Sequence, residues 1–318
     1  MQALRTHVAG VDVHKEVIVV TILIGEADQE PEVTQFECRT FTDDLKEAAL
    51  RLLELGVTSA ACESTGIYWK PLFNVWQPMG IDVTVGNAHH IKNVPGRKTD
   101  INDSQWIATL HRYGLIRPSF IPGAVFQRMR ILSRHRTNLV GDQARVKNRV
   151  QKVLEDGNVK LSSVISDVFG KGGLSILRGI ADSVLDSSVL ANLYKTRAKR
   201  KEEIKKALKH CLTLEHCFVI RELLCQYDSL QERIEGVDGE LARLATPYTK
   251  LIDCLDEIPG IDITSAVGIL AETSDDLSSF RDERKFAAWA GVAAGSNESA
   301  GKKNARNAAK VTPICARS

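Results

Sequence analysis

The stretch GRKTDINDSQWIATL (residues 96–110) carries two aspartates, Asp100 and Asp103, three positions apart. The apolar residues after them, among them Trp106 and Leu110, recur at helical spacing and predict an α-helix. Three positions is about one helical turn, so both carboxylates would project the same way. Like charges this close repel unless solvent or a shared cation compensates. The pair therefore indicates either half of a metal site or, for Asp100, a simple helix N-cap.

The residues upstream of this stretch predict an α/β domain. Runs rich in β-branched residues, or with alternating polarity, predict strands within residues 7–25, 32–41, 57–65 and 80–88. Periodic apolar residues predict helices at 42–56 and around Trp69 to Trp76. Strands alternating with helices favour a mixed sheet covered by helices, and we place this domain at residues 1–122.

The residues downstream predict long helices. A basic helix is expected near 126–156, then a glycine-rich break at FGKGGLS (169–175), then a long helical segment near 196–246. Few turn residues interrupt this part, which favours an extended hairpin or coiled coil over residues 123–250.

The last part of the chain, residues 251–318, predicts a small α-helical domain. Its Pro259-Gly260-Ile261-Asp262 turn between two helical patterns is typical of a helix-hairpin-helix. Such a turn offers backbone N–H groups to a phosphate, which makes Gly260 a candidate contact.

Composition and charge narrow the class of protein. The 318 residues suffice for about two ordinary domains. No apolar run approaches the ~20 residues of a membrane span, and no secretory signal is visible. Seven cysteines without a CxxC pair favour a reducing cytoplasm. The net charge of +2 hides a basic block from Phe126 to Leu154, with eight Lys or Arg residues against Asp142, which indicates polyanion contacts.

Two further carboxylates have an unusual sequence context. Asp12 lies in VAGVDVHK and Glu63 in SAACESTG, apolar strand-like runs in which an unpaired carboxylate is costly. Carboxylates at strand ends and on an adjacent helix can converge at one edge of a sheet. A set of hard oxygen donors there predicts a divalent cation, Mg²⁺ first and Mn²⁺ as the alternative.

Four segments together resemble one family: GVDVHK, CESTGIYW, NAHHIKNVPGRKTDINDSQWIATL and IPGIDITSAVGILAE…FAAWAGVAAGSNESAGK. They are similar to bacterial insertion-sequence transposases with an amino-terminal RuvC-like (RNase H-like) DEDD domain and a serine-containing carboxy-terminal transposase domain, the bridge-RNA-guided recombinases. The resemblance implies that Asp12, Glu63, Asp100 and Asp103 are metal ligands and that Ser299, in NESAGKK, is the nucleophile. Ser296 is the competing assignment.

The resemblance also implies activity and partners. The expected enzyme is a DNA transposase or recombinase that cuts and exchanges strands with Mg²⁺ and a phosphoserine link. A structured RNA encoded by the element would guide it to the element ends and the target DNA. A dimer or tetramer on nucleic acid is implied, in the bacterial cytoplasm and on the nucleoid when bound to DNA, without a membrane partner.

Basic residues supply the predicted nucleic-acid contacts. Sparse aromatics near the basic helix favour phosphate contacts over base stacking. The candidates, besides Gly260, are Arg97, Lys98, Arg128, Arg130, Arg134, Arg145, Lys147 and Arg149.

The end of the chain departs from the family pattern. Relatives continue past the serine with Gly-Asn-x-x-Leu-Arg and another helix, whereas this chain reads KVTPICARS. A truncated or frameshifted copy is our hypothesis for this departure. Two alternatives therefore stay open: an impaired transposase that only binds DNA or RNA, and a RuvC-like structure-specific nuclease without serine chemistry.

Overall fold

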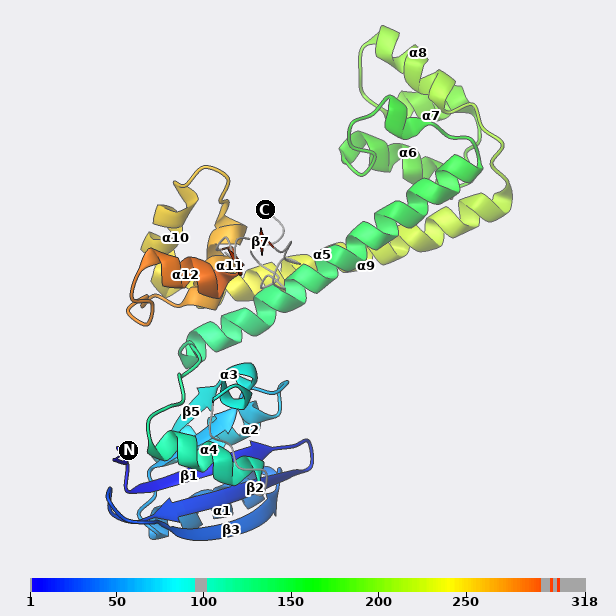
Figure 1. Cartoon of the computed structure of the whole chain (residues 1–318). Helices are drawn as coiled ribbons and strands as arrows, with labels where there is room; N and C mark the ends of the chain where they lie inside the picture. The colour runs from blue at the N-terminus through cyan, green and yellow to red at the C-terminus, as the bar shows by residue number, and fades with distance from the viewer. Residues whose placement is uncertain (1, 95–101, 293–297, 300–301, 304–318) are drawn as a thin grey trace. The chain divides into compact units, whose positions relative to one another are not determined.

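The computed structural model describes residues 2–94, 102–292, 298–299 and 302–303. The chain divides into two compact units, Met1–Ile121 and Pro122–Ser318, each described here by itself (Figure 1). The further boundary predicted at residue 250 stays a prediction.

The first unit is built on a five-stranded sheet in the order β3-β2-β1-β4-β5. β1 pairs antiparallel with β2 and β2 with β3, whereas β1 pairs parallel with β4 and β4 with β5. The strands are β1 (His7–Val13), β2 (Val17–Ile24), β3 (Glu32–Arg39), β4 (Ser59–Glu63) and β5 (Asp82–Gly86). The expected α/β domain with a mixed sheet is confirmed.

Helices cover both faces of this sheet. On one face, α1 (Thr42–Glu54) and α2 (Trp69–Trp76) bury Leu52 and Trp76 against the strand residues Val11, Val20 and Cys62. The other face receives α4 (Asp103–Arg112) (Figure 1). A 3₁₀ turn (Gln77–Met79) and the short α3 (Ala88–Lys92) flank β5.

Gly10 lets α4 approach β1 closely. A Cβ added at Gly10 would lie 2.1 Å from the backbone nitrogen of Ala108 and 2.3 Å from the carbonyl oxygen of Ser104. Only glycine accommodates a helix backbone at that distance. The start of α4 is thereby held near the carboxyl end of β1.

The second unit is organised around two long helices, α5 (Ala124–Asp156) and α9 (Leu214–Ala245). They run antiparallel: Arg136 bonds to Asp238, and Asp156 at the other end of α5 bonds to His216. The basic helix predicted near 126–156 is confirmed.

The helical segment predicted at 196–246 is wrong as one piece. Helix α8 (Ala198–Ala207) ends before α9 begins, because Thr213 caps α9 and starts a new helix. The glycine-rich break is also shorter than predicted, since Gly170 is the N-cap of α6 (Lys171–Ala181), which contains Gly172 and Gly173. With α7 (Ser187–Leu193) and a 3₁₀ turn (Leu161–Ser163), these helices share a core with the adjoining ends of α5 and α9.

The remaining described elements are short helices after α9. A 3₁₀ turn (Thr246–Tyr248) leads to α10 (Thr249–Asp256), α11 (Ile263–Thr273) and α12 (Glu283–Ala290). Two-residue strands β6 (Glu298–Ser299) and β7 (Lys302–Lys303) pair antiparallel. Within the described part of the chain, no helix is both long and apolar enough to cross a bilayer.

Candidate active site

Two of the predicted carboxylates lie on neighbouring parallel strands. Val11 of β1 pairs with Cys62 of β4, so Asp12 and Glu63 follow one position later on each strand. Strand side chains alternate between faces. Ala61, two residues before Glu63, packs with α4 in the cluster containing Trp106, which puts Glu63 on the α4 face. By the same alternation Asp12 shares the face of Gly10, against which α4 lies.

Asp103 is the first residue of α4, so the helix carries a third carboxylate to this face. The helix N-cap is Asn102, whose side-chain oxygen accepts a hydrogen bond from the Gln105 backbone nitrogen at 2.9 Å. The alternative of Asp100 as the N-cap is therefore wrong. Asp100 itself lies outside the described residues, as do Arg97 and Lys98.

A polar network holds the start of α4 on the sheet. The hydroxyls of Thr21 and Ser104, both 1% exposed, are 2.7 Å apart. The Asn102 side-chain nitrogen donates to Gln35 Oε1 at 3.1 Å, and the Ser104 hydroxyl donates to Asn102 Oδ1 at 3.2 Å. These bonds fix the position of Asp103. These bonds were not predicted from the sequence, in which a serine on the apolar face of the predicted helix was the available signal.

The neighbouring charged side chains affect the pKa of Asp12. Burial raises the pKa of Asp12 above its usual value, and the charges of Asp103 and Glu63 raise it further. His14 opposes this shift, since its Nε2 lies 3.2 Å from Asp12 Oδ2. His14 is a second residue of the site that the sequence analysis missed, although it lies in the quoted GVDVHK segment.

The donor set fits a hard divalent cation. Carboxylates that repel one another at a half-buried site are stabilised by such an ion, and their oxygens are the ligands that Mg²⁺ prefers. Among the described residues, no three His, Cys, Asp or Glu side chains already form a closed ligand cluster. Asp12, Glu63 and Asp103 lie on one face of the sheet, and the role of Asp100 as a further ligand stays a prediction.

The loop after Glu63 is fastened to the site. The Thr65 hydroxyl donates a hydrogen bond to Glu63 Oε1. The Ser64 backbone nitrogen donates to the Gly86 carbonyl oxygen at 2.8 Å, which joins the loop to the end of β5. The carboxylate of Glu63 is thus oriented by its own loop.

Ser299 lies in β6, where its backbone pairs with Lys302 of β7. Its side chain is outside the described part of the structure, and Ser296 lies wholly outside it. The assignment of Ser299 as nucleophile stays a prediction.

Several predicted nucleic-acid contacts have partners inside the protein. Arg130 and Arg134 both pair with the buried Glu272 of α11, each with a shortest N–O distance of 2.8 Å. Arg145 pairs with Asp142, one turn away on α5. Lys147 lies over the rings of Phe169 and Tyr227, at 5.5 and 5.7 Å from their centroids.

Arg128 and Arg149 are exposed on α5, as phosphate contacts require. Gly260 adopts a positive φ of 92° in the turn between α10 and α11. The Asp262 side chain already accepts a hydrogen bond from the Ser265 backbone nitrogen at 2.7 Å at the start of α11. This carboxylate puts negative charge beside the N–H groups that a phosphate would need, so phosphate binding at Gly260 stays a prediction.

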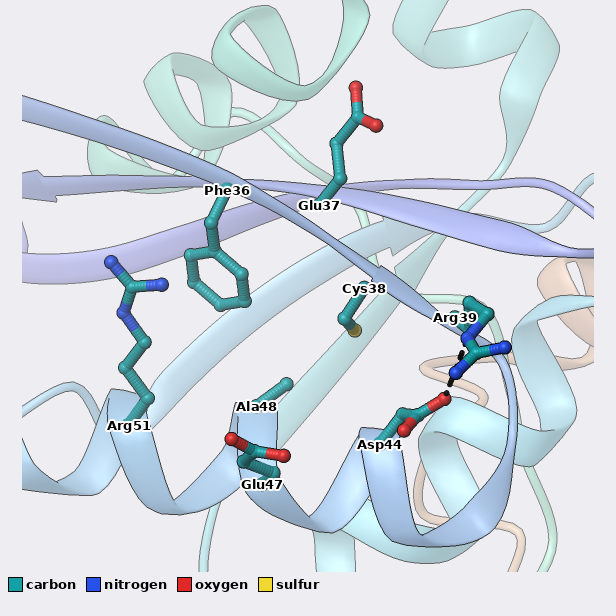
Figure 2. Close-up of a pocket in the computed structure, with 8 residues that line it drawn as sticks. All are labelled: Phe36, Glu37, Cys38, Arg39, Asp44, Glu47, Ala48 and Arg51. Carbon is teal, nitrogen blue, oxygen red and sulfur yellow. Dashed lines mark ion pairs between the residues drawn. The ribbon is translucent and has the colours of Figure 1, made fainter.

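A hollow of about 360 Å³ lies between β3 and α1. Figure 2 shows Phe36 and Cys38 pointing from β3 toward α1, while Glu37 points the opposite way. Arg39 pairs with Asp44 at 3.5 Å, and Arg51 lies 4.3 Å from the centroid of the Phe36 ring. Burial, with the nearby acidic side chains, raises the pKa of Cys38 to about 11. The thiol stays protonated at neutral pH, so the hollow has no ready nucleophile.

Comparisons with known proteins match both ends of the chain to transposases. Residues 9–158 match the DEDD domain model of the IS110 type, described as a transposase. Residues 252–311 match the model described as transposase IS116/IS110/IS902 family. No curated protein matches the chain.

Two solved structures are similar to part of the chain. One is the RuvC structure of Thermus thermophilus, with 13% identity over 36% of this chain and 100% of that chain, at a TM-score of 0.28. The other is T. thermophilus RuvC in complex with Holliday junction substrate, with 12% identity, the same coverage and the same TM-score.

Proposed function

This chain is a transposase of the IS110 family, and from that premise we propose that it cuts and rejoins DNA at a metal-assisted carboxylate site with a serine nucleophile. The ligands are Asp12, Glu63, Asp100 and Asp103, and the nucleophile is Ser299. A structured RNA guides the reaction to the element ends and the target DNA.

One observation supports the proposal most strongly. Three carboxylates from β1, β4 and the start of α4 share one face of the sheet, and burial first, then the charges of Asp103 and Glu63, raises the pKa of Asp12. Burial and the neighbouring negative charges disfavour the ionised form of Asp12, and a bound cation would offset both effects.

The reaction uses the chain's residues as follows. A bound Mg²⁺ would supply charge neutralisation at the phosphate and help to activate the attacking hydroxyl. The carboxylates hold the ion and orient the phosphodiester. Ser299 Oγ attacks phosphorus, so that one P–O bond forms at the serine while one breaks to the deoxyribose, and the hydroxyl proton passes to the departing oxygen. Strand exchange follows from the phosphoserine link.

Partners follow from charge and from the family. Arg128 and Arg149 on α5 offer cations to nucleic-acid phosphates. The resemblance to RNA-guided recombinases supports a guide RNA, and it supports a homo-oligomer in which one subunit supplies the serine to another's carboxylates.

The test is a denaturing-gel assay for a covalent protein–DNA adduct. Full-length protein is incubated with the element's ends, its flanking non-coding RNA and Mg²⁺. We expect an adduct with the wild-type chain and none with Ser299→Ala or Asp12→Ala.

Two matched variants control for nonspecific loss. Ser296→Ala removes the neighbouring serine, and Asp82→Ala removes an exposed aspartate in the first unit; both should retain the adduct. Metal-dependent cutting without an adduct would contradict the serine step and favour a RuvC-like nuclease. Binding without cutting in every form would contradict catalysis and leave a nucleic-acid-binding protein.

A further inference from the structure

Two large side chains are exposed in the loop that follows Glu63. Ile67 is 67% exposed and Tyr68 is 41% exposed, in the loop that follows Glu63. The next residue, Trp69, begins α2 and packs against the core and against Phe73, with ring centroids 5.8 Å apart. The chain therefore sends one of three consecutive large side chains inward and presents the other two at the loop.

The loop is held in a defined shape. Gly66 has φ of +57°, a left-handed turn that favours glycine. A Cβ placed on Gly66 would lie 3.7 and 3.8 Å from two ring carbons of Tyr68, so the tyrosine ring leans on the turn. The Lys70 backbone nitrogen donates to the Ile67 carbonyl oxygen at 3.1 Å. Exposure of the two side chains is thus combined with a fixed backbone, which reduces the entropy lost when they bind.

The loop lies within reach of nucleotides that flank a phosphate at the site. Ile67 follows Glu63 by four residues, so their Cα atoms are at most about 14 Å apart. Successive base pairs of a duplex are spaced at about 3.4 Å, so this reach covers the few nucleotides on either side of the reacting phosphate. The phosphate contacts of the carboxylate site would leave the bases of these nucleotides free to meet the loop.

We propose that Ile67 and Tyr68 form a nucleobase-binding wedge beside the carboxylate site, an inference that rests on the proposed function. Tyr68 stacks on one unpaired base, and Ile67 fills the space that the base leaves. Aromatic rings stack on any base, and isoleucine is one of the side chains that proteins insert between base steps. The wedge places the scissile phosphate along the strand without reading sequence.

The test is a double-mutant cycle between the protein and the DNA. Gapped DNA duplexes carry an abasic nucleotide at one position at a time, and fluorescence anisotropy gives Kd for full-length protein in the Asp12→Asn background, which blocks cutting. We expect Tyr68→Ala to weaken binding by a factor on the order of 10. At one position, the abasic nucleotide should weaken binding of the chain that keeps Tyr68 by the same factor. The same abasic nucleotide should leave the Kd of Tyr68→Ala unchanged. Tyr68→Phe should retain both effects, and Ile67→Ser should weaken binding at the same position.

Phe41→Ala is the matched control, because Phe41 is an aromatic residue of the same unit that is 66% exposed at the start of α1. It should leave Kd and the abasic profile unchanged. The wedge would be overturned if Phe41→Ala and Tyr68→Ala lost the same binding affinity. It would also be overturned if the effects of Tyr68→Ala and of the abasic nucleotide on binding were additive at every position.

Failure of the wedge is distinguishable from failure of the proposed function. Cutting by a chain with Asp12 intact, lost in Asp12→Asn, reports on the carboxylate site alone. Such cutting without coupling at Tyr68 overturns only the wedge. Absence of both cutting and binding by the wild-type chain overturns both proposals.

Discussion

Asp12 carries the clearest sequence signal in the candidate site, because a carboxylate inside the run VAGVDV is costly without compensation. In the structure Asp12 is partly buried near Asp103 and Glu63, and burial first, then those two charges, raises its pKa. The residues that hold the site were not predictable in the same way. The bond between Thr21 and Ser104 joins positions 83 residues apart in the chain, and no local pattern encodes such a pairing.

A buried histidine, His111, lies at the end of α4 opposite Asp103 and leads to a prediction about pH and stability. Burial, and then the charge of Arg5, lowers the pKa of His111 to about 4, and the neutral ring bonds to the Ser59 hydroxyl at 2.8 Å. The unfolded chain takes up this proton near pH 6.5, so the free energy of unfolding should fall as pH drops from about 6.5 to 4. The loss should reach at most about 3 kcal/mol.

Urea unfolding followed by tryptophan fluorescence measures this, because Trp69, Trp76 and Trp106, three of the four tryptophans, lie in the first unit. His111→Gln should flatten the pH dependence between 6.5 and 4, whereas His89→Gln, at an exposed position, should not. Equal pH dependence in the wild-type chain and His111→Gln would contradict the prediction.

At the scale of elements, periodicity predicted the long helix α5 but not the end of α8. Ile204 and Leu208 continue a helical pattern toward α9, yet both are buried in the core of the α6–α8 region. The backbone leaves the helix there, and the Cys211 backbone nitrogen donates a hydrogen bond to the Gly157 carbonyl oxygen at 2.8 Å. Tertiary bonds of this kind override a spacing that fits a helix.

The ion pairs between α5 and α11 lead to a prediction about the stability of this helix contact. Glu272 is 5% exposed and pairs with Arg130 and Arg134 of α5. Glu272→Gln leaves Arg130, whose side chain is 19% exposed, without its counter-charge. We expect the α5–α11 contact to weaken by about 3 kcal/mol, the usual cost of breaking one side of a buried pair.

Hydrogen exchange followed by mass spectrometry measures this locally, and peptides of α11 should exchange faster. Glu240→Gln provides the control, because Glu240 pairs with Arg243 one turn away on the exposed side of α9. It should leave exchange in α11 unchanged. Exchange in α11 of Glu272→Gln as slow as in the wild-type chain would contradict the prediction and show that apolar packing alone holds the two helices together.

At the scale of the whole molecule, alternating strands and helices were enough to predict the α/β unit and its mixed sheet. The transposase match at both ends supports the family that the quoted motifs resembled. Sequence patterns could not predict the insertion of α6, α7 and α8 between the long helices. Nor could they predict that Arg130 and Arg134 form ion pairs with the buried Glu272, because Glu272 lies on a helix distant in the sequence.

The central claim is that Asp12, Glu63, Asp100 and Asp103 bind one set of divalent cations. Isothermal titration of the full-length chain with Mn²⁺ tests it without any DNA. We predict that Asp12→Asn and Glu63→Gln each weaken Mn²⁺ binding by more than about tenfold, while Asp82→Asn leaves it unchanged. Undiminished Mn²⁺ binding in both Asp12→Asn and Glu63→Gln would contradict the claim.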